Sequence, residues 1–222
     1  MTAKPAIHNV TGLILAGGRG SRMNNLDKGL QELNGKTLID HVISRLASQV
    51  DFIAINANRN SPTYDRLGFP VWSDKGINPE AIDDASNGNA STDESGYRGP
   101  LAGLETGLMH CTTPYLLTVP CDSPFLPINL AERLMSSLQQ QHAAIAVACT
   151  VEKNQLRLQP VFCLLHVSLL NQLQSYLNSG GRKMDGWYGD HTVAHVIFDD
   201  VSDFRNLNTL EDIRACAKNI NN

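Results

Sequence analysis

The chain contains 222 residues, 42% of them hydrophobic, which is enough for one well-cored α/β domain over residues 1–222 and short for two. Eighteen Lys and Arg residues against 22 Asp and Glu residues give a net charge of −4, so no bulk positive field attracts nucleic acid or an anionic membrane. No stretch approaches the roughly 20 apolar residues of a membrane span, and no signal-peptide-like run opens the chain. We therefore expect a cytoplasmic protein.

The five cysteines are odd in number, widely spaced and without a Cys-x-x-Cys pair, which argues against a disulfide framework or a structural zinc site. They are Cys111, Cys121, Cys149, Cys163 and Cys216. The seven histidines show no metal-ligand spacing either. We expect reduced thiols, mostly in the core, and assign no histidine to a metal.

The first half of the chain begins with a strand, a glycine loop and a helix. Residues 11–16 form a short apolar run that Gly17 ends, and residues 38–46 carry apolar side chains at helical spacing. Residues 51–57 and 69–72 are predicted to be two further buried strands, each followed by polar residues.

The second half continues the alternation of helices and strands. A turn leads into a helix over 99–109, and a strand over 115–119 follows. Further helices are predicted at 130–138, 169–177 and after a Thr209–Asp212 capping box, and further strands at 143–149 and 160–165. This alternation predicts an α/β fold with a mostly parallel sheet and helices on both faces, in which ligands bind beyond the carboxyl ends of the strands.

The segment 75–98 differs from the rest, because only Ile77 and Ile82 in it are large and apolar. We expect a flexible insertion within one domain and not a linker between two. It is either a tolerated surface insertion or a lid, since it lies between two strand-end motifs.

The glycine loop over 15–23 is a candidate phosphate cradle, because missing side chains let an anion approach its backbone N–H groups. The glycines concerned are Gly17, Gly18 and Gly20, and the nearby cationic side chains are Arg19, Arg22 and Lys28. An ordinary glycine turn with solvated basic residues is the alternative. Neither a P-loop nor a dinucleotide fingerprint is complete, since Met23 stands at the third glycine of the latter.

Asp122 follows the predicted strand 115–119 directly and lies between Pro120 and Pro124. Mg²⁺ is usually held by one or two carboxylates plus substrate phosphates, so one aspartate at a strand exit can suffice. The alternative is a loop aspartate that caps the helix starting near Leu130.

Asn56, Asn58 and Asp74 end two other strands, where such side chains can bind a base or ribose hydroxyls. Turn chemistry explains these residues equally well. Asn206 and Asn208 could likewise face the site or only shape the turn before the last helix.

A second basic glycine turn lies at 180–183, and a solvated loop is its default interpretation.

Several of these motifs together resemble the molybdenum cofactor guanylyltransferases. The opening match is Leu15-Ala-Gly-Gly-Arg-Gly-Ser-Arg-Met23, Asp27-Lys-Gly-Leu30 and Leu33-Asn-Gly-Lys-Thr-Leu38, in which Asp-Lys-Gly-Leu discriminates most. Later matches are Asn56–Arg59, Gly99–Gly103, Pro120–Pro124, Gln159-Pro160 and Asn206–Thr209. The sequence departs from the family in its long 75–98 segment and in Gln159, where relatives often carry His.

The resemblance implies a Rossmann-like fold of the GT-A type and a role for each matched residue. Leu15, Ala16, Gly17, Gly18, Lys28, Asn56, Asp74 and Asp122 would bind GTP, with Asp122 also holding Mg²⁺. Gly103, Gly181, Arg182, Asn206 and Asn208 would lie on the side of the second substrate, molybdopterin. The catalytic residues would be Asp122, Lys28, Arg22 and Arg19.

The reaction implied is transfer of GMP from GTP to the terminal phosphate of molybdopterin, with release of pyrophosphate. Molybdenum-insertion proteins and molybdoenzyme chaperones would be transient partners. A cytidylyltransferase or a sugar-phosphate nucleotidyltransferase is the nearest alternative, and Asp-Lys-Gly-Leu argues against both. A non-catalytic GTP-binding cofactor-delivery protein is the alternative from another class.

Overall fold

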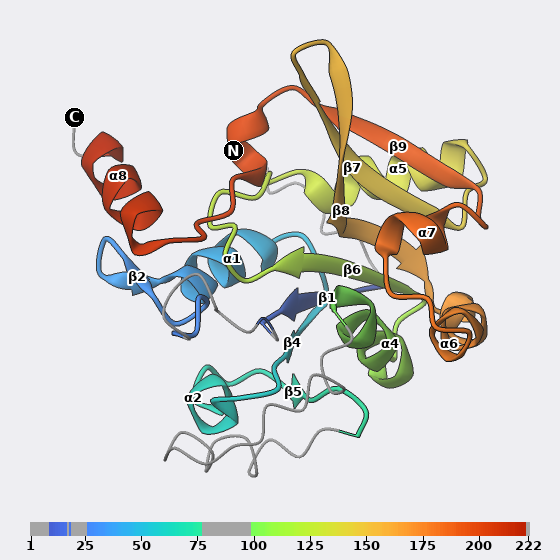
Figure 1. Ribbon diagram of the computed structural model, residues 1–222, viewed down its shortest axis with the longest axis horizontal. Coiled ribbons are helices and arrows are strands. Elements are labelled where there is room, and N and C mark those ends of the chain that lie inside the picture. Colours follow the sequence, from blue (N-terminus) through green and yellow to red (C-terminus); the bar gives the residue numbers. More distant parts are fainter. Residues whose placement is uncertain (1–8, 17, 19–25, 77–98, 221–222) are drawn as a thin grey trace.

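A computed structural model describes residues 9–16, 18, 26–76 and 99–220 (Figure 1). At its centre is a seven-stranded sheet of order β5-β4-β1-β6-β8-β7-β9. The strands are β1 (Val10–Leu15), β4 (Phe52–Asn56), β5 (Val71–Trp72), β6 (Tyr115–Pro120), β7 (Ile145–Glu152), β8 (Gln155–His166) and β9 (Val193–Phe198).

The sheet is mostly parallel, as the alternation of elements predicts. Strands β5, β4, β1 and β6 pair in parallel, and β9 is parallel to β7. Strand β8 is antiparallel to both β6 and β7. The chain goes from β1 to β4 and β5 on one side and returns to β6 on the other, so the strand order reverses between β1 and β6. In open α/β sheets, such a switch point is where ligands bind.

Helices cover both faces of the sheet, because side chains along each strand alternate between two cores. In β1, Val10 and Ile14 pack into one core and Leu13 into the other. The first core receives helices α1 (Leu38–Leu46), α2 (Ser61–Asp65) and α5 (Leu130–Gln140). The second receives α4 (Pro100–His110), α6 (Leu170–Asn178) and α7 (Met184–Tyr188).

A small third cluster joins the last helix, α8 (Leu210–Ile220), to the hairpin of β2 (Glu32–Leu33) and β3 (Lys36–Thr37). The hairpin turn uses Asn34 and Gly35, both with positive φ. Thr37 then begins α1 with a capping box, in which its hydroxyl and the Asp40 carboxylate each bond the other's backbone N–H. Two 3-10 helices, η4 (Val167–Leu169) and η5 (Val201–Phe204), complete the described elements.

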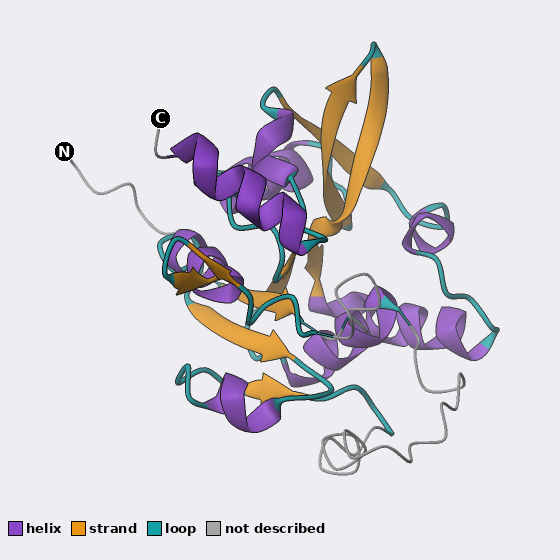
Figure 2. Ribbon diagram, turned by 60° about the vertical axis from the view of Figure 1, so that its left-hand side comes forward, coloured by secondary structure: helices purple, strands orange, loops and turns teal. Residues whose placement is uncertain are grey.

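The elements that the sequence did not predict include β2, β3, α2 and α7. The strands β7 and β8 also extend further than predicted, into a two-stranded ribbon that turns at Lys153 and Asn154 and projects from the body of the molecule (Figure 2). All five cysteines are free and four are buried, in agreement with core thiols. Within the described ranges, no helix is long and apolar enough to cross a bilayer.

Candidate active site at the ends of the parallel strands

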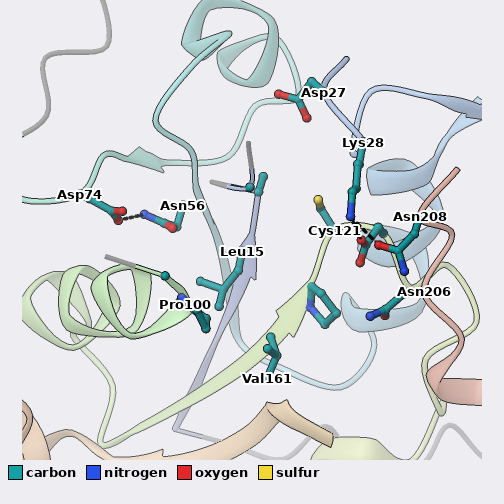
Figure 3. A pocket seen from close by; sticks show the side chains of 15 residues that line it. Leu15, Asp27, Lys28, Asn56, Asp74, Pro100, Cys121, Val161, Asn206 and Asn208 are labelled. Atoms are coloured by element: carbon teal, nitrogen blue, oxygen red, sulfur yellow. Dashed lines mark hydrogen bonds and ion pairs between the residues drawn. The ribbon is translucent and has the colours of Figure 1, made fainter. Parts of the chain in front are cut away.

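A pocket of about 260 Å³ lies at the carboxyl ends of β1, β4, β5 and β6, where the strand order reverses (Figure 3). Its lining comprises Leu15, Ala16, Gly18, Asp27, Lys28, Asn56, Asp74, Gly99, Pro100, Pro120, Cys121, Asp122, Val161, Asn206 and Asn208. These residues come from distant parts of the sequence, and they meet because the carboxyl ends of adjacent parallel strands share one edge of the sheet.

One side of the pocket carries an ion pair between Lys28 and Asp122. The Lys28 Nζ atom lies 3.2 Å from Asp122 Oδ2 and donates to Asn208 Oδ1 at 2.5 Å. Asp122 is only 8% exposed, and burial raises the pKa of its carboxyl group, while the nearby Lys28 ammonium lowers it. A cation and a buried carboxylate therefore face the same space.

The chain after η5 closes this side. The backbone N–H of Leu207 donates to the carbonyl oxygen of Asp122 at 2.9 Å, and the Ser123 hydroxyl donates to the side-chain oxygen of Asn206. Leu207 itself is fully buried. These contacts present Asn206 and Asn208 to the pocket beside Lys28 (Figure 3).

The other side of the pocket carries a clamp of two amides around one carboxylate. Asn56 Nδ2 donates to Asp74 Oδ1 at 2.8 Å, and Asn58 Nδ2 donates to Asp74 Oδ2 at 2.7 Å. Asn58 Oδ1 also accepts from the backbone N–H of Asp74 at 2.8 Å. The Thr106 hydroxyl is a second, longer donor to Asp74 Oδ1, at 3.5 Å. Asp74 Oδ2 keeps a second lone pair, so the oriented carboxylate can accept a further hydrogen bond from a ligand.

Gly103 makes room for this clamp from helix α4. A Cβ atom at Gly103 would lie 2.3 Å from Asn56 Oδ1, which no real Cβ contact shows. The absence of a side chain at this position therefore lets Asn56 lie between α4 and the sheet. Gly103 acts through Asn56 and does not itself line the pocket.

The structure brings together most of the residues predicted from the sequence. Leu15, Ala16, Gly18, Lys28, Asn56, Asp74, Asp122, Asn206 and Asn208 all line the pocket. Gly17, Arg19 and Arg22 lie outside the described residues, as does most of the 75–98 segment.

Gly181 and Arg182 are described but do not line the pocket. The Arg182 Nη1 atom donates to the Leu177 carbonyl oxygen at 2.8 Å, at the end of α6. The turn nevertheless runs past the start of α4, since a Cβ at Gly99 would lie 3.9 Å from the Arg182 carbonyl oxygen.

Several lining residues were not singled out from the sequence: Asp27, Gly99, Pro100, Pro120, Cys121 and Val161. Most of them belong to motifs that were noted, such as Asp-Lys-Gly-Leu and Pro-Cys-Asp-Ser-Pro. Their position next to a predicted site residue could therefore have indicated that they line the pocket. Val161 has no such signal, because it reaches the pocket only through the antiparallel pairing of β8 with β6.

Asp122, Asn206 and Asn208 bring side-chain oxygens to this side of the pocket, and oxygen ligands suit a hard cation such as Mg²⁺ better than a softer metal. Among the described residues, no group of three or more His, Cys, Asp and Glu side chains could hold a metal ion. A single carboxylate fits a cation that arrives on substrate phosphates better than one held in a preformed protein cage.

Comparison with known proteins gives a consistent result. The MobA-like NTP transferase domain family matches residues 12–193. The chain is 47% identical to a molybdenum cofactor guanylyltransferase of Bordetella petrii over 206 residues, covering 93% of this chain and 96% of that one. It is 45% identical to the guanylyltransferase of the same description from Ralstonia nicotianae, covering 95% and 97%.

Among solved structures, molybdopterin-guanine dinucleotide biosynthesis protein A of Archaeoglobus fulgidus matches with a TM-score of 0.68. It is 17% identical and the match covers 95% of this chain and 98% of that one. At this identity, the likeness shows the fold.

Proposed function

This chain belongs to the molybdenum cofactor guanylyltransferases, within the MobA-like NTP transferase family, and from that premise we propose how its pocket works. The chain is a nucleotidyltransferase that transfers GMP in the synthesis of the dinucleotide form of the molybdenum cofactor. We propose that GTP and molybdopterin meet in the pocket described above and that pyrophosphate leaves from it.

The two sides of the pocket suit the two ends of GTP. The clamp of Asn56, Asn58 and Asp74 offers oriented acceptors for a base or for ribose hydroxyls, so it takes the nucleoside end. Lys28 lies across the pocket on the side of Asp122 and takes the phosphates, together with backbone groups of Leu15, Ala16 and the glycine loop that follows. Arg19 and Arg22 of that loop are the further cations that the sequence provides.

The reaction requires little acid–base chemistry from the protein. A phosphate oxygen of molybdopterin attacks the α-phosphorus of GTP in line, and the bond to the pyrophosphate oxygen breaks on the opposite side. The attacking group is already an anion, so no strong general base is needed. The main cost lies in bringing anions together and in the charge that grows on pyrophosphate, which Lys28 offsets directly.

A divalent cation completes the charge balance, and we propose that it is Mg²⁺. When bound, the cation would supply positive charge that offsets the charge of the phosphates. Asp122 would hold it once Lys28 turns from the carboxylate toward the phosphates.

Molybdopterin would approach from the side of Asn206 and Asn208, which line the pocket next to Lys28. The turn at Gly181 and Arg182 lies further out, beside the start of α4, where it could meet the part of the acceptor that extends from the pocket.

One observation carries this proposal: a lysine and a buried aspartate face each other at the switch point of a parallel sheet. The test is pyrophosphate release from GTP, CTP and ATP in turn, with Mg²⁺ and molybdate-loaded molybdopterin, beside a control without the pterin. Pterin-dependent release from GTP alone is expected. Release from CTP instead would identify a cytidylyltransferase, and GTP binding without turnover would identify a cofactor-delivery protein.

A further inference from the structure

The Asp27 side chain lines the pocket, but its oxygens are engaged elsewhere. The carboxylate is 7% exposed and accepts from the Tyr64 hydroxyl at 2.6 Å, from Asn60 Nδ2 at 3.0 Å and from the backbone N–H of Gly29 at 3.2 Å. The first two donors belong to α2 and to the residue before it. Figure 3 shows the Asp27 carboxylate turned away from the Lys28 ammonium, which points toward Asn208. Asp27 therefore serves the protein and not a ligand.

Tyr64 is built closely into this arrangement. It is fully buried, and a Cβ atom at Gly29 would lie 2.8 Å from its hydroxyl oxygen and 3.2 Å from the Cys121 Sγ atom. Glycine at this position lets the hydroxyl pass over the turn and reach Asp27. Burial raises the pKa of the Tyr64 hydroxyl, so the group remains a hydrogen-bond donor at physiological pH.

The same cluster reaches the glycine loop through Arg59. Its Nε atom lies 3.8 Å from Asp27 Oδ2, and its Nη2 atom donates to the carbonyl oxygens of Gly18 at 3.0 Å and Leu26 at 3.4 Å. Arg59, paired with Asp27, thus connects this cluster to Gly18 within the glycine loop and to Leu26 after it.

Lys28 lies between the two residues that Tyr64 contacts. Its backbone carbonyl accepts from Gln31 at 3.1 Å, and the carbonyl of Gly29 accepts from Ile39 at 3.0 Å. The turn is therefore held to the start of α1 on one side and to Tyr64 on the other. The lysine side chain is long and flexible, with four rotatable bonds. Fixing the backbone from which it starts therefore limits the positions that its ammonium group can reach.

We propose that Tyr64 is a positioning residue for the reaction: its hydroxyl, through Asp27, fixes the turn that aims Lys28 at the phosphates. In this proposal, Asp27 and Gly29 of the Asp-Lys-Gly motif accommodate the Tyr64 hydroxyl, and only Lys28 binds the substrate. It rests on the proposed function, because Lys28 is taken to bind the triphosphate.

The first test compares Tyr64→Phe with Tyr188→Phe. Tyr188 is a matched control, since it is 5% exposed and its hydroxyl donates to the Pro160 carbonyl oxygen at 2.6 Å. Tyr64→Phe is expected to lower kcat/KM for GTP about tenfold, the order expected for a hydrogen bond to a charged group. Tyr188→Phe is expected to lower kcat/KM less than about twofold, because neither Tyr188 nor Pro160 lines the pocket. Both variants lose a buried hydrogen bond and are therefore expected to lose thermal stability.

A double-mutant cycle separates positioning from a structural role. In a Lys28→Gln background, Tyr64→Phe is expected to change kcat/KM and equilibrium GTP affinity by less than about twofold, because the group it positions is gone. An equal loss in both backgrounds would overturn the proposal. Absence of pterin-dependent turnover by the parent protein would instead overturn the proposed function, and the cycle then proceeds on GTP affinity alone.

A crystal structure of Tyr64→Phe adds a readout that needs no ligand. The distance between Lys28 Nζ and Asp122 Oδ2, 3.2 Å in the parent, is expected to increase, or the ammonium group is expected to occupy several positions. An unchanged Lys28 in that variant would overturn the proposal.

Discussion

Asp122 holds a charge that the fold alone does not favour. Burial raises the pKa of its carboxyl group, and the Lys28 ammonium offsets only part of that effect. A neutral side chain in the same place would spare the protein the desolvation of a carboxylate. The cation and phosphates that we propose for this site would account for a carboxylate in this place.

Replacing Asp122 with Ala is expected to lower kcat about 10²–10³-fold, as for other single electrostatic contacts to a transition state. The measurement is pterin-dependent pyrophosphate release from GTP. Asp199→Ala, which removes an exposed aspartate outside the pocket, serves as the control and is expected to keep full activity. Equal activity of the two variants would refute the cation assignment.

Removing the Asp122 charge is expected to preserve or raise stability, although it lowers activity. Because the pKa of Asp122 is higher in the folded chain than in the unfolded one, its contribution to stability is fully present below the unfolded pKa and is lost as pH rises through the folded pKa. Asp122→Asn cannot ionise, so it is expected to melt at or above the temperature of the parent at pH 7. Thermal unfolding at pH 7 and near pH 4 checks this, since the advantage should shrink in acid; a clearly lower Tm of the variant at pH 7 would contradict it.

At the scale of elements, α4 shows how one helix serves both the pocket and the core. A Cβ atom at Gly103 would lie 2.3 Å from Asn56 Oδ1, and one at Gly107 would lie 2.5 Å from the Leu13 side chain. The two glycines are four residues apart on the same face of α4. One of them admits a polar side chain of the site, and the other lets the helix approach the sheet.

These glycines provide a matched pair of variants. Gly103→Ala and Gly107→Ala are both expected to lower Tm, because each adds a methyl group to a filled space. Only Gly103→Ala is expected to weaken GTP binding, about tenfold if the displaced Asn56 releases one hydrogen bond to the Asp74 carboxylate. Equilibrium GTP binding, measured where both variants are folded, distinguishes them. Equal GTP affinities of the two variants would show that the position of Asn56 does not matter for nucleotide binding.

The sequence predicted the elements that carry strong periodicity, and with them the residues at strand ends. Asn56, Asp74 and Asp122 could be placed at one edge because carboxyl ends of parallel strands meet there. Helix α2 could not be predicted, since Ser61–Asp65 is a single short turn that begins after Asn60 in the left-handed region. Tyr64 was missed for the same reason. The sequence around its partner Asp27 does not indicate which side chain donates a hydrogen bond to that carboxylate.

At the scale of the whole molecule, the pocket depends on a cluster remote from the main sheet. Leu207 packs with Leu33, Leu38, Ile213 and Cys216, which join the β2–β3 hairpin to α8. The backbone of Leu207 also bonds to Asp122. Packing in this cluster therefore sets where Asn206 and Asn208 enter the pocket.

Leu207→Ala tests this dependence. Removing a fully buried leucine is expected to cost about 2–5 kcal/mol of stability and to lower kcat/KM, since Asn208 loses its fixed place beside Lys28. Leu138→Ala is the control, because Leu138 is 6% exposed and packs in the main core on α5, outside the pocket lining. Denaturant unfolding is expected to show similar losses for both, and steady-state kinetics a loss for Leu207→Ala alone. A similar kinetic loss in both variants would indicate a general effect of stability.

The order in which the pocket residues occur along the chain has a consequence for synthesis. Lys28, Asn56, Asp74 and Asp122 leave the ribosome long before Asn206 and Asn208, which follow all seven strands of the central sheet. Domains fold largely from the N-terminus as the chain emerges, so a nascent chain can form much of its sheet while its lysine still lacks the amide beside it. On the roles proposed here, the residues for GTP are therefore synthesised before those for molybdopterin, and the acceptor side of the pocket is completed only when translation is nearly finished.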